Sequence, residues 1–528
     1  MNQATNLSTQ SVLVSINTNA LLKLNLIELF IQELHVNEIR YCHWKSNEHL
    51  DASMLGNTDL DILFSKKQKP LLEIIFLNCG FKKLNAIQQK QYEGIEDYIG
   101  LDDESGKIIH VHTHYALTIG ENYLKSYQLN LEEYLLTTRV YDDKYNIFRA
   151  NPAMELILLY FRSALKLRLR DRIKLIANKN VEYTGGILDE YHWLKLRCTD
   201  SEVEEHLKIM YADYLPVYQF IIGPFNRLTM VKLAVLLKRH YKKQRLFNPV
   251  TANIKRWYRE LYLKNIRRLS NRVNYPIPVQ RINSRGGLIV AIIGADGSGK
   301  STVINNLHQT FKKKMDIYKI YFGMGGGRMS WYRYMLRKLK QFTSVLKRNT
   351  VSRSNKSGIA ASIVEKNFSS KTATSFTGNF FKCLEALMVA IEKKANLQKM
   401  QVAKKKGMLV LCDRFPQNSV VGYNDGPALT DYKNSGNIIW RSIAKLEAKM
   451  YDSFAASSPD ILFKLVADAR VIEARKPGQT SIEILKKKIE GIKNLQFNAS
   501  CKVITINAEE PLEEVLKTIK KNIWNLYP

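Results

Sequence analysis

The chain has 528 residues, enough for two to four domains. Its 80 lysines and arginines against 49 acidic residues leave a formal net charge of +31. This excess predicts an anionic partner: nucleic acid, an acidic lipid surface or a phosphorylated small molecule. The hydrophobic fraction of 45% and the charged fraction of 24% are typical of a globular protein and exclude a disordered or fibrous chain.

Six cysteines are spread through the sequence without a Cys-x-x-Cys pair, which argues against a disulfide framework and a cysteine-rich zinc site. No basic segment precedes an apolar stretch near Met1, so we expect no secretory signal. The longest apolar runs, such as Leu288–Ile293, are far shorter than the ~18 residues of a membrane span. We therefore expect a cytoplasmic protein, and peripheral attachment to the inner membrane face is left open.

Changes of pattern along the chain predict four regions. Residues 1–150 alternate helical and strand patterns and form one predicted domain, and residues 151–237 have the apolar spacing of a helical extension. Residues 238–285 form a predicted basic helical linker, with 14 lysines and arginines and the single acid Glu260. A new periodicity begins after Gly286-Gly287, so residues 286–528 form the second predicted domain.

Residues 286–528 contain five short, nearly continuous apolar runs separated by helical patterns. Such runs are typical of parallel strands buried on both faces. This region is therefore predicted to be an α/β domain with an open, doubly wound parallel sheet. The five predicted strands are Leu288–Ile293, Ile317–Phe322, Met408–Cys412, Ile461–Val466 and Val503–Ile506.

The first of these strands leads into Gly294-Ala-Asp-Gly-Ser-Gly-Lys-Ser301, which matches the phosphate-loop pattern G-x-x-x-x-G-K-[ST]. Glycines let backbone N–H groups point at phosphate oxygens, and the following helix adds the positive end of its dipole. Lys300 is expected to reach the β- and γ-phosphates, and Ser301 to ligate Mg²⁺. A glycine-rich turn that happens to contain a lysine is the alternative. The predicted nucleotide-binding residues are Gly294, Asp296, Gly297, Ser298, Gly299, Lys300, Ser301 and Thr302.

Two further elements follow predicted strands. Asp413 and Arg414 come at the carboxyl end of the third strand, the edge at which open α/β sheets bind ligands. Asp413 is expected to hold the metal with its water shell and Arg414 to clamp a phosphoryl oxygen, unless the two form an ordinary strand-end ion pair. The helix Val471–Lys476 carries Arg475, which is expected either to close over the transferring phosphate or to lie at a solvated helix end. Lys300, Asp413, Arg414 and Arg475 are thus the predicted catalytic residues.

These motifs resemble those of thymidylate kinases, which commonly read G-x-D-G-x-G-K-S-T and D-R-[YFH]. The matching segments are Gly294–Thr302 and Asp413-Arg414-Phe415, and Pro459-Asp460 and Glu473-Ala-Arg475 also fit. The resemblance covers residues 286–528. It implies a nucleoside-monophosphate-kinase-like fold that uses ATP and Mg²⁺.

The same resemblance implies roles for single residues. Lys300 and Ser301 would bind ATP, Arg414 would bind the acceptor phosphate, and Asp296 would lie near the acceptor. The sequence departs from the family where the acceptor is bound, because Phe322-Gly-Met-Gly-Gly-Gly-Arg328 replaces an R-E-P-G-G-T-like segment. The run from Gln417 also lacks the family's Tyr-Gln-Gly pattern. The chain is therefore more similar to the thymidylate-kinase-like proteins of bacterial surface-polysaccharide gene clusters, and dTMP is disfavoured as the acceptor.

Near the N-terminus, Asp59 and Asp61 lie two residues apart on a predicted strand and so project from one face. Two such carboxylates can hold a divalent metal against phosphates, and a solvated strand edge is the alternative. Residues 1–150 resemble an uncharacterised group of nucleotidyltransferase-like domains that read D-x-D and later D-x-H-[WY], which implies an α+β fold. His112 stands at the third acid of that pattern, a change that shifts metal preference from Mg²⁺ toward softer metals. His110, His112 and His114 share one face of their strand.

Together these features predict an enzyme: a P-loop kinase that transfers a phosphoryl group from ATP, with Mg²⁺, to a small phosphorylated acceptor in surface-polysaccharide biosynthesis. Two alternatives remain open. One is a nucleic-acid end-processing kinase and nucleotidyltransferase, and the other is a non-enzymatic nucleotide-gated scaffold at the membrane surface. The basic stretches 238–285 and 328–356 would bind nucleic acid in the first alternative and an anionic membrane in the second. A homodimer is also compatible with the sequence.

Overall fold

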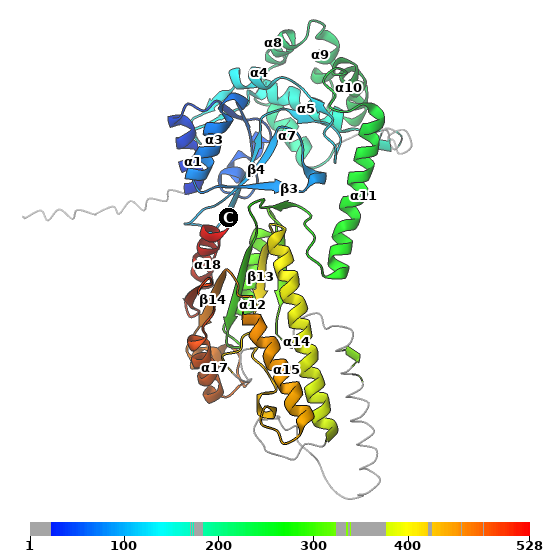
Figure 1. Ribbon diagram of the computed structural model, residues 1–528. Helices are drawn as coiled ribbons and strands as arrows, with labels where there is room; N and C mark the ends of the chain where they lie inside the picture. Colours follow the sequence, from blue (N-terminus) through cyan, green and yellow to red (C-terminus); the bar gives the residue numbers. More distant parts are fainter. Residues whose placement is uncertain are drawn as a thin grey trace, which may run out of the picture. The chain divides into compact units, whose positions relative to one another are not determined.

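The computed structural model describes residues 23–168, 170–171, 173, 183–323, 334–335, 338, 376–420, 425–455, 457–478 and 480–528. These residues form two compact units, and Figure 1 labels many of their helices and several of their strands. The first unit comprises the described parts of Met1–Cys79, Ile109–Leu117 and Leu129–Lys242. The second unit comprises the described parts of Gly80–Ile108, Thr118–Gln128 and Lys243–Pro528.

The core of the second unit is a five-stranded sheet of order β12-β13-β11-β14-β15, in which every neighbouring pair is parallel. Of these five strands, β11 comes first in the sequence and lies in the middle of the sheet, so its carboxyl end adjoins those of β13 and β14. The predicted α/β fold is confirmed. The strands are β11 (Leu288–Gly294), β12 (Ile317–Tyr321), β13 (Leu409–Asp413), β14 (Ile461–Val466) and β15 (Lys502–Asn507).

Helices connect these strands and complete the hydrophobic core. α12 packs against α18, where Phe311 stacks on Trp524 with ring centroids 6.4 Å apart. The long α14 runs beside α15, as Figure 1 shows. The helices are α12 (Lys300–Phe311), α14 (Phe376–Lys405), α15 (Ile438–Ala455), α16 (Ala469–Arg475), α17 (Ile482–Asn494) and α18 (Leu512–Leu526).

The second unit contains further elements from earlier in the chain. The antiparallel order β10-β3-β4 brings Ile282 opposite Asn85, and β6 and β7 form a separate antiparallel pair. Arg281 of β10 forms an ion pair with Asp97 of β4 at 3.0 Å. These strands are β3 (Lys82–Ala86), β4 (Ile95–Leu101), β6 (Thr118–Ile119), β7 (Tyr127–Gln128) and β10 (Arg281–Ile282), and the short helix η3 (Gln88–Lys90) lies between β3 and β4.

Within the basic segment predicted to be a helical linker lies α11 (Pro249–Val273). It begins where the side chain of Asn248 accepts a hydrogen bond from the N–H of Thr251, with Pro249 in the first turn. It ends at Asn274, whose backbone is left-handed with φ 48°. Sequence signals at both ends therefore define this helix.

The first unit is built on a mixed sheet of order β5-β2-β1-β9-β8. β2 is parallel to β5 and antiparallel to β1, while β1 is parallel to β9. The predicted α+β class is confirmed, and the likeness to nucleotidyltransferases stays a prediction. The strands are β1 (Tyr41–His43), β2 (Leu60–Phe64), β5 (Ile108–His114), β8 (Val140–Asp142) and β9 (Ile147–Arg149).

Helices surround this sheet, and α5 is buried along most of its length. Pro152 occupies its first turn and the side chain of Asn151 caps it, as the sequence signals for a helix start require. The helices are α1 (Asn25–Val36), α2 (Leu50–Met54), α3 (Lys69–Asn78), α4 (Glu132–Thr137), α5 (Pro152–Lys166), α7 (Gly186–Lys195), α8 (Asp200–Met210), α9 (Leu215–Ile222) and α10 (Arg227–His240).

Some predicted features lie outside the described residues. These are the glycine-rich run from residue 324 to Arg328, the basic stretch 328–356 apart from Tyr334, Met335 and Lys338, and residues 421–424 of the segment that begins at Gln417. In the part of the chain that is described, no helix is both long enough and apolar enough to cross a bilayer.

Candidate functional site

The loop between β11 and α12 follows a path that favours glycine. Gly297 and Gly299 have φ angles of 96° and 93°, in the left-handed region that other residues disfavour. A Cβ atom on Gly297 would also lie 3.0 Å from Cγ2 of Ile472 in α16. Gly299 is the N-cap residue of α12. The predicted glycines are therefore needed for the chain to curl at the N-terminus of this helix.

Lys300 begins α12 and folds back over the loop. Its side chain is buried, and Nζ donates to the carbonyl oxygens of Gly294 (2.9 Å) and Ala295 (2.7 Å). Burial, together with the nearby charge of Arg414, lowers the pKa of Lys300 to about 8. Because an anion beside a buried ammonium favours its charged form, this position suits a phosphate group.

Asp413 is the last residue of β13, and the sheet register places it opposite Ile292 of β11, two residues before the loop begins. The residue is buried, and among the described residues its Oδ1 has no hydrogen-bond partner. Burial raises the pKa of this carboxyl group. Since a buried oxygen without a partner costs free energy, Oδ1 is suited to bind a cation or a metal-bound water.

Arg414 joins the end of β13 to the loop. Its backbone is left-handed with φ 67°, which is uncommon for a residue other than glycine. Nη2 donates to Oδ1 of Asp296 at 2.5 Å, and Nη1 donates to Oδ2 of Asp425 at 3.5 Å. Lys300 and Lys488 each lie 3.7 Å from the carboxylate of Asp296. Burial acts to raise the pKa of Asp296, but these three cations lower it overall.

The residues at this edge of the sheet fit a nucleotide with Mg²⁺. Lys300 and the loop N–H groups would hold phosphate oxygens. Ser301 and Thr302 are exposed in the first turn of α12, and Ser301 and Asp413 offer the oxygen ligands that Mg²⁺ prefers. Two buried atoms that have no hydrogen-bond partner among the described residues, Oδ1 of Asp413 and Oγ of Ser298, favour this assignment.

The sequence predicts Arg475 either over the transferring phosphate or at a solvated helix end. Its hydrogen bond in the structure is made neither to the loop nor to Arg414. Its Nη2 donates to the carbonyl oxygen of Ala508, just after β15, at 2.9 Å. The helix α16 does contact the loop, because Ile472 and Lys476 lie against the Cα of Gly297. The structure therefore brings Lys300, Asp413 and Arg414 together, whereas the Arg475 side chain is hydrogen-bonded to Ala508.

Two residues of this site were not predicted. Asp425 lies in the segment that departs from the thymidylate kinase pattern, and that departure was the signal that could have found it. Lys488 lies in a run of three lysines in α17 that carries no distinguishing spacing. Its proximity to Asp296 depends on how α17 packs and not on local sequence.

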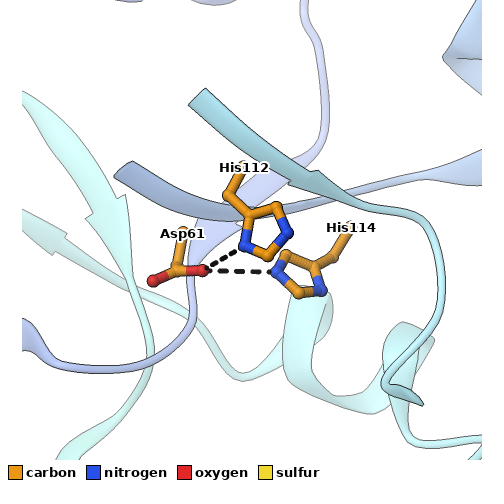
Figure 2. A group of neighbouring side chains, drawn as sticks. All are labelled: Asp61, His112 and His114. Atoms are coloured by element: carbon orange, nitrogen blue, oxygen red, sulfur yellow. Dashed lines mark hydrogen bonds and ion pairs between the residues drawn. The ribbon is translucent and has the colours of Figure 1, made fainter. Parts of the chain in front are cut away.

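In the first unit, the predicted acids meet the histidines of the neighbouring strand. The register of β2 and β5 pairs Asp61 with His112, and His114 follows two residues later on the same face. His112 Nδ1 and His114 Nε2 lie 3.0 and 3.3 Å from Oδ1 of Asp61, and Figure 2 shows both rings directed at this oxygen. Lys45 Nζ lies 2.9 Å from the same atom. Asp59 instead has its Oδ2 2.9 Å from Nδ1 of His110.

Protonation in this cluster follows from burial and from the neighbouring charges. Burial acts to raise the pKa of Asp61, but Lys45 and the hydrogen bonds with the two imidazoles hold it well below its usual range. Burial also lowers the pKa of His114 well below its usual range. Asp61 is thus a carboxylate and His114 a neutral imidazole at pH 7. His110 and His114 are both buried, so these histidines are not the outward-facing polar residues of an exposed strand.

A second buried group, which sequence reasoning missed, contains Glu48, Glu155 and Glu190. Glu155 accepts hydrogen bonds from the backbone N–H and the side-chain Nδ2 of Asn47, and Glu190 forms an ion pair with Arg162 at 2.5 Å. Burial, together with the nearby charge of Glu190, raises the pKa of Glu48 to about 7 and that of Glu155 to about 8. No sequence signal identifies the group, because Glu155 lies among apolar residues of α5.

No family model matches the chain. The chain is similar to two proteins of Escherichia coli strain K12. It is 26% identical over 239 residues to the uncharacterized ATP-binding protein YghR, covering 44% of this chain and 86% of that protein. It is 29% identical over 238 residues to the uncharacterized ATP-binding protein YghS, covering 45% and 92%. Among solved structures, thymidylate kinase from Candida albicans matches 45% of this chain and 91% of its own, with 15% identity and a TM-score of 0.27.

Proposed function

We propose that the second unit is an ATP- and Mg²⁺-dependent phosphotransferase that acts on a small phosphorylated acceptor. One observation carries this proposal: Lys300, Asp413 and Arg414 meet at the same edge of the parallel sheet as the glycine loop. The names of the relatives YghR and YghS support ATP as the nucleotide. Surface-polysaccharide biosynthesis, suggested by the sequence resemblance, is the proposed pathway.

Each residue has a role that its position supports. Lys300 and the loop N–H groups bind the β- and γ-phosphates and stabilise charge on the transferring group. Ser301 and Asp413 would hold Mg²⁺, which supplies charge neutralisation at the phosphate oxygens when bound. Arg414 orients the acceptor phosphate, since a guanidinium binds two phosphate oxygens at once. Asp296 holds the Arg414 side chain in place through their 2.5 Å contact.

The first test is nucleotide binding. The full-length protein should bind ATP with Mg²⁺ as one equivalent, measured by isothermal titration calorimetry. Affinity should fall when Mg²⁺ is removed with a chelator, because Asp413 and the phosphates would then face each other without a cation. Failure of the folded protein to bind any of the four common nucleoside triphosphates would contradict the proposal.

A second observation concerns α11, which presents an apolar stripe to solvent. Val250, Ile254, Trp257 and Leu261 follow one another at three- and four-residue spacing, and each is at least 40% exposed. The other side of the helix is fixed to its own unit. There Arg256 forms an ion pair with Glu121 at 3.2 Å, and Arg259 donates to the carbonyl oxygen of Tyr123 at 3.3 Å.

The remaining basic residues of α11 make this exposed stripe complementary to an anionic lipid surface. Lys255, Lys264, Arg267, Arg268 and Arg272 are all exposed on the helix. A helix with aromatic and aliphatic residues on one face and basic residues beside them lies in the plane of a membrane interface. We propose that α11 attaches the protein to acidic phospholipid through this exposed face.

The full-length protein should therefore sediment with vesicles of phosphatidylglycerol and phosphatidylcholine, and much less with pure phosphatidylcholine. Replacing both Trp257 and Leu261 by alanine should weaken the binding about tenfold or more, because two interfacial anchors are lost. Ile209→Ala, an exposed apolar residue of the first unit, is the matched control. The lipid proposal would be contradicted if the double variant sedimented with the vesicles as much as the wild type does. It would also be contradicted if the wild type bound oligonucleotides tightly and salt-sensitively instead of the vesicles.

A further inference from the structure

The cluster of Asp61, His112 and His114 offers one carboxylate oxygen and two imidazole nitrogens. In the part of the chain that is described, each residue offers a ligand atom and these atoms lie within 4.8 Å of one another. Imidazole suits Zn²⁺, Mn²⁺ and other first-row transition metals, whereas Mg²⁺ and Ca²⁺ prefer sites made of oxygen alone. The donor set therefore differs from the oxygen set proposed for the nucleotide site.

The distances already match those of a small coordination sphere. Around a tetrahedral ion with metal–ligand bonds of about 2.0–2.2 Å, neighbouring ligand atoms lie about 3.4 Å apart. Oδ1 of Asp61 lies 3.0 Å from Nδ1 of His112 and 3.3 Å from Nε2 of His114. Small side-chain shifts would thus be enough to admit an ion among the three atoms seen in Figure 2.

The protein holds these ligands in place, and the cluster is partly exposed at His112. Asp61 and His112 are fixed by the register of β2 and β5, and Trp44 packs edge-on against His114 with ring centroids 5.2 Å apart. The His114 side chain is 1% exposed, whereas that of His112 is 20% exposed. Three protein ligands with a solvent-facing side are typical of sites where water or substrate completes the coordination.

Lys45 shows that Asp61 already attracts a cation. Its ammonium lies 2.9 Å from the same Oδ1, and its side chain is 20% exposed. A long side chain in this position can turn toward solvent, so its charge competes with a metal ion for the carboxylate without blocking the site permanently. In the metal-free protein, Lys45 neutralises Asp61.

We propose that Asp61, His112 and His114 bind a divalent first-row transition metal ion, and that the ion displaces the ammonium of Lys45. Asp59 is not a ligand, because its carboxylate is placed beside His110. The site lies entirely within the first unit and does not depend on the phosphotransferase proposal.

The test uses the full-length protein, freed of metal with a chelator and titrated with Co²⁺ in the absence of nucleotide. We expect one equivalent of Co²⁺ with a visible absorption spectrum of nitrogen and oxygen ligation, displaced by Zn²⁺ and not by a large excess of Mg²⁺. His112→Ala and Asp61→Asn should each weaken binding about 100-fold or more. Lys45→Met should instead tighten binding, because it removes the competing charge and keeps the apolar stem.

Two controls separate this site from other metal-binding groups. His192→Ala removes an exposed histidine outside the cluster, and Asp413→Asn alters the nucleotide site, so both should bind Co²⁺ as the wild type does. Co²⁺ should raise the melting temperature of the wild type and leave that of His112→Ala unchanged. Circular dichroism checks that the His112→Ala protein is folded. Unchanged Co²⁺ binding in His112→Ala and Asp61→Asn, weaker binding in Lys45→Met, or no stoichiometric binding would overturn the proposal.

Discussion

Replacing Lys300 by alanine is expected to lower ATP turnover by about 10³-fold while the protein remains folded. Nζ is buried and contacts the carbonyl oxygens of Gly294 and Ala295, so it lies against the loop that binds phosphates in this proposal. Phosphoryl transfer depends on positioning and charge stabilisation, so losing this charge removes stabilisation that no water can replace. The measurement is ADP release under saturating ATP and Mg²⁺.

Lys313→Ala provides the matched control for this result. Lys313 is an exposed lysine just beyond the C-terminal end of α12, so its alanine variant removes the same charge at the end of the helix opposite to the loop. Its alanine variant should turn over ATP at the wild-type rate. Near-normal turnover in a folded Lys300→Ala protein would refute the kinase assignment.

Asp413→Asn is expected to lower Mg²⁺-dependent turnover by about 10²-fold or more and to leave stability equal or higher. The two effects separate because burial raises the pKa of the Asp413 carboxyl, so its charged form is disfavoured in the folded protein. Asparagine keeps the shape of the side chain and removes the charge. Activity and thermal unfolding are measured on the same samples over a range of Mg²⁺ concentrations.

A purely structural Asp413 would give the opposite pattern. If its carboxylate mainly stabilised the strand end, the asparagine variant would melt at a lower temperature and retain its response to Mg²⁺. Asp460→Asn is a useful comparison, because Asp460 lies just before β14, at the end of the sheet opposite to Asp413, and pairs with Lys404 at 2.5 Å. That variant should lose stability and keep its dependence on Mg²⁺.

Much of the second unit could be predicted because its signals are local. Continuous apolar runs predicted the five parallel strands, and the spacing of glycines predicted a loop whose Gly297 and Gly299 adopt left-handed backbone. Asp413 could be placed near that loop because parallel strands carry their carboxyl ends to one edge. These predictions rest on residues close together in the sequence.

What could not be predicted depends on packing between distant segments. The pairing of Ile282 with Asn85 joins β10 to β3 across most of the first unit's sequence, and no periodic pattern indicates it. Arg475 lies on the predicted helix, but which carbonyl it contacts depends on how α16 meets the end of β15. Likewise, the sequence placed Asp59 and Asp61 on one face, whereas only the register with β5 gives each of them a histidine partner.

The most direct test of the phosphotransferase proposal is ³¹P nuclear magnetic resonance of ATP and Mg²⁺ with the full-length protein and a panel of acceptors. The panel contains a nucleoside monophosphate, a sugar 1-phosphate and a polyol phosphate, each compared with the Lys300→Ala protein. We predict that ADP forms faster than with Lys300→Ala, and that one acceptor class gains a new phosphorus signal from the transferred γ-phosphoryl group. ADP formation that is no faster in the wild type than in Lys300→Ala with every acceptor would contradict the account.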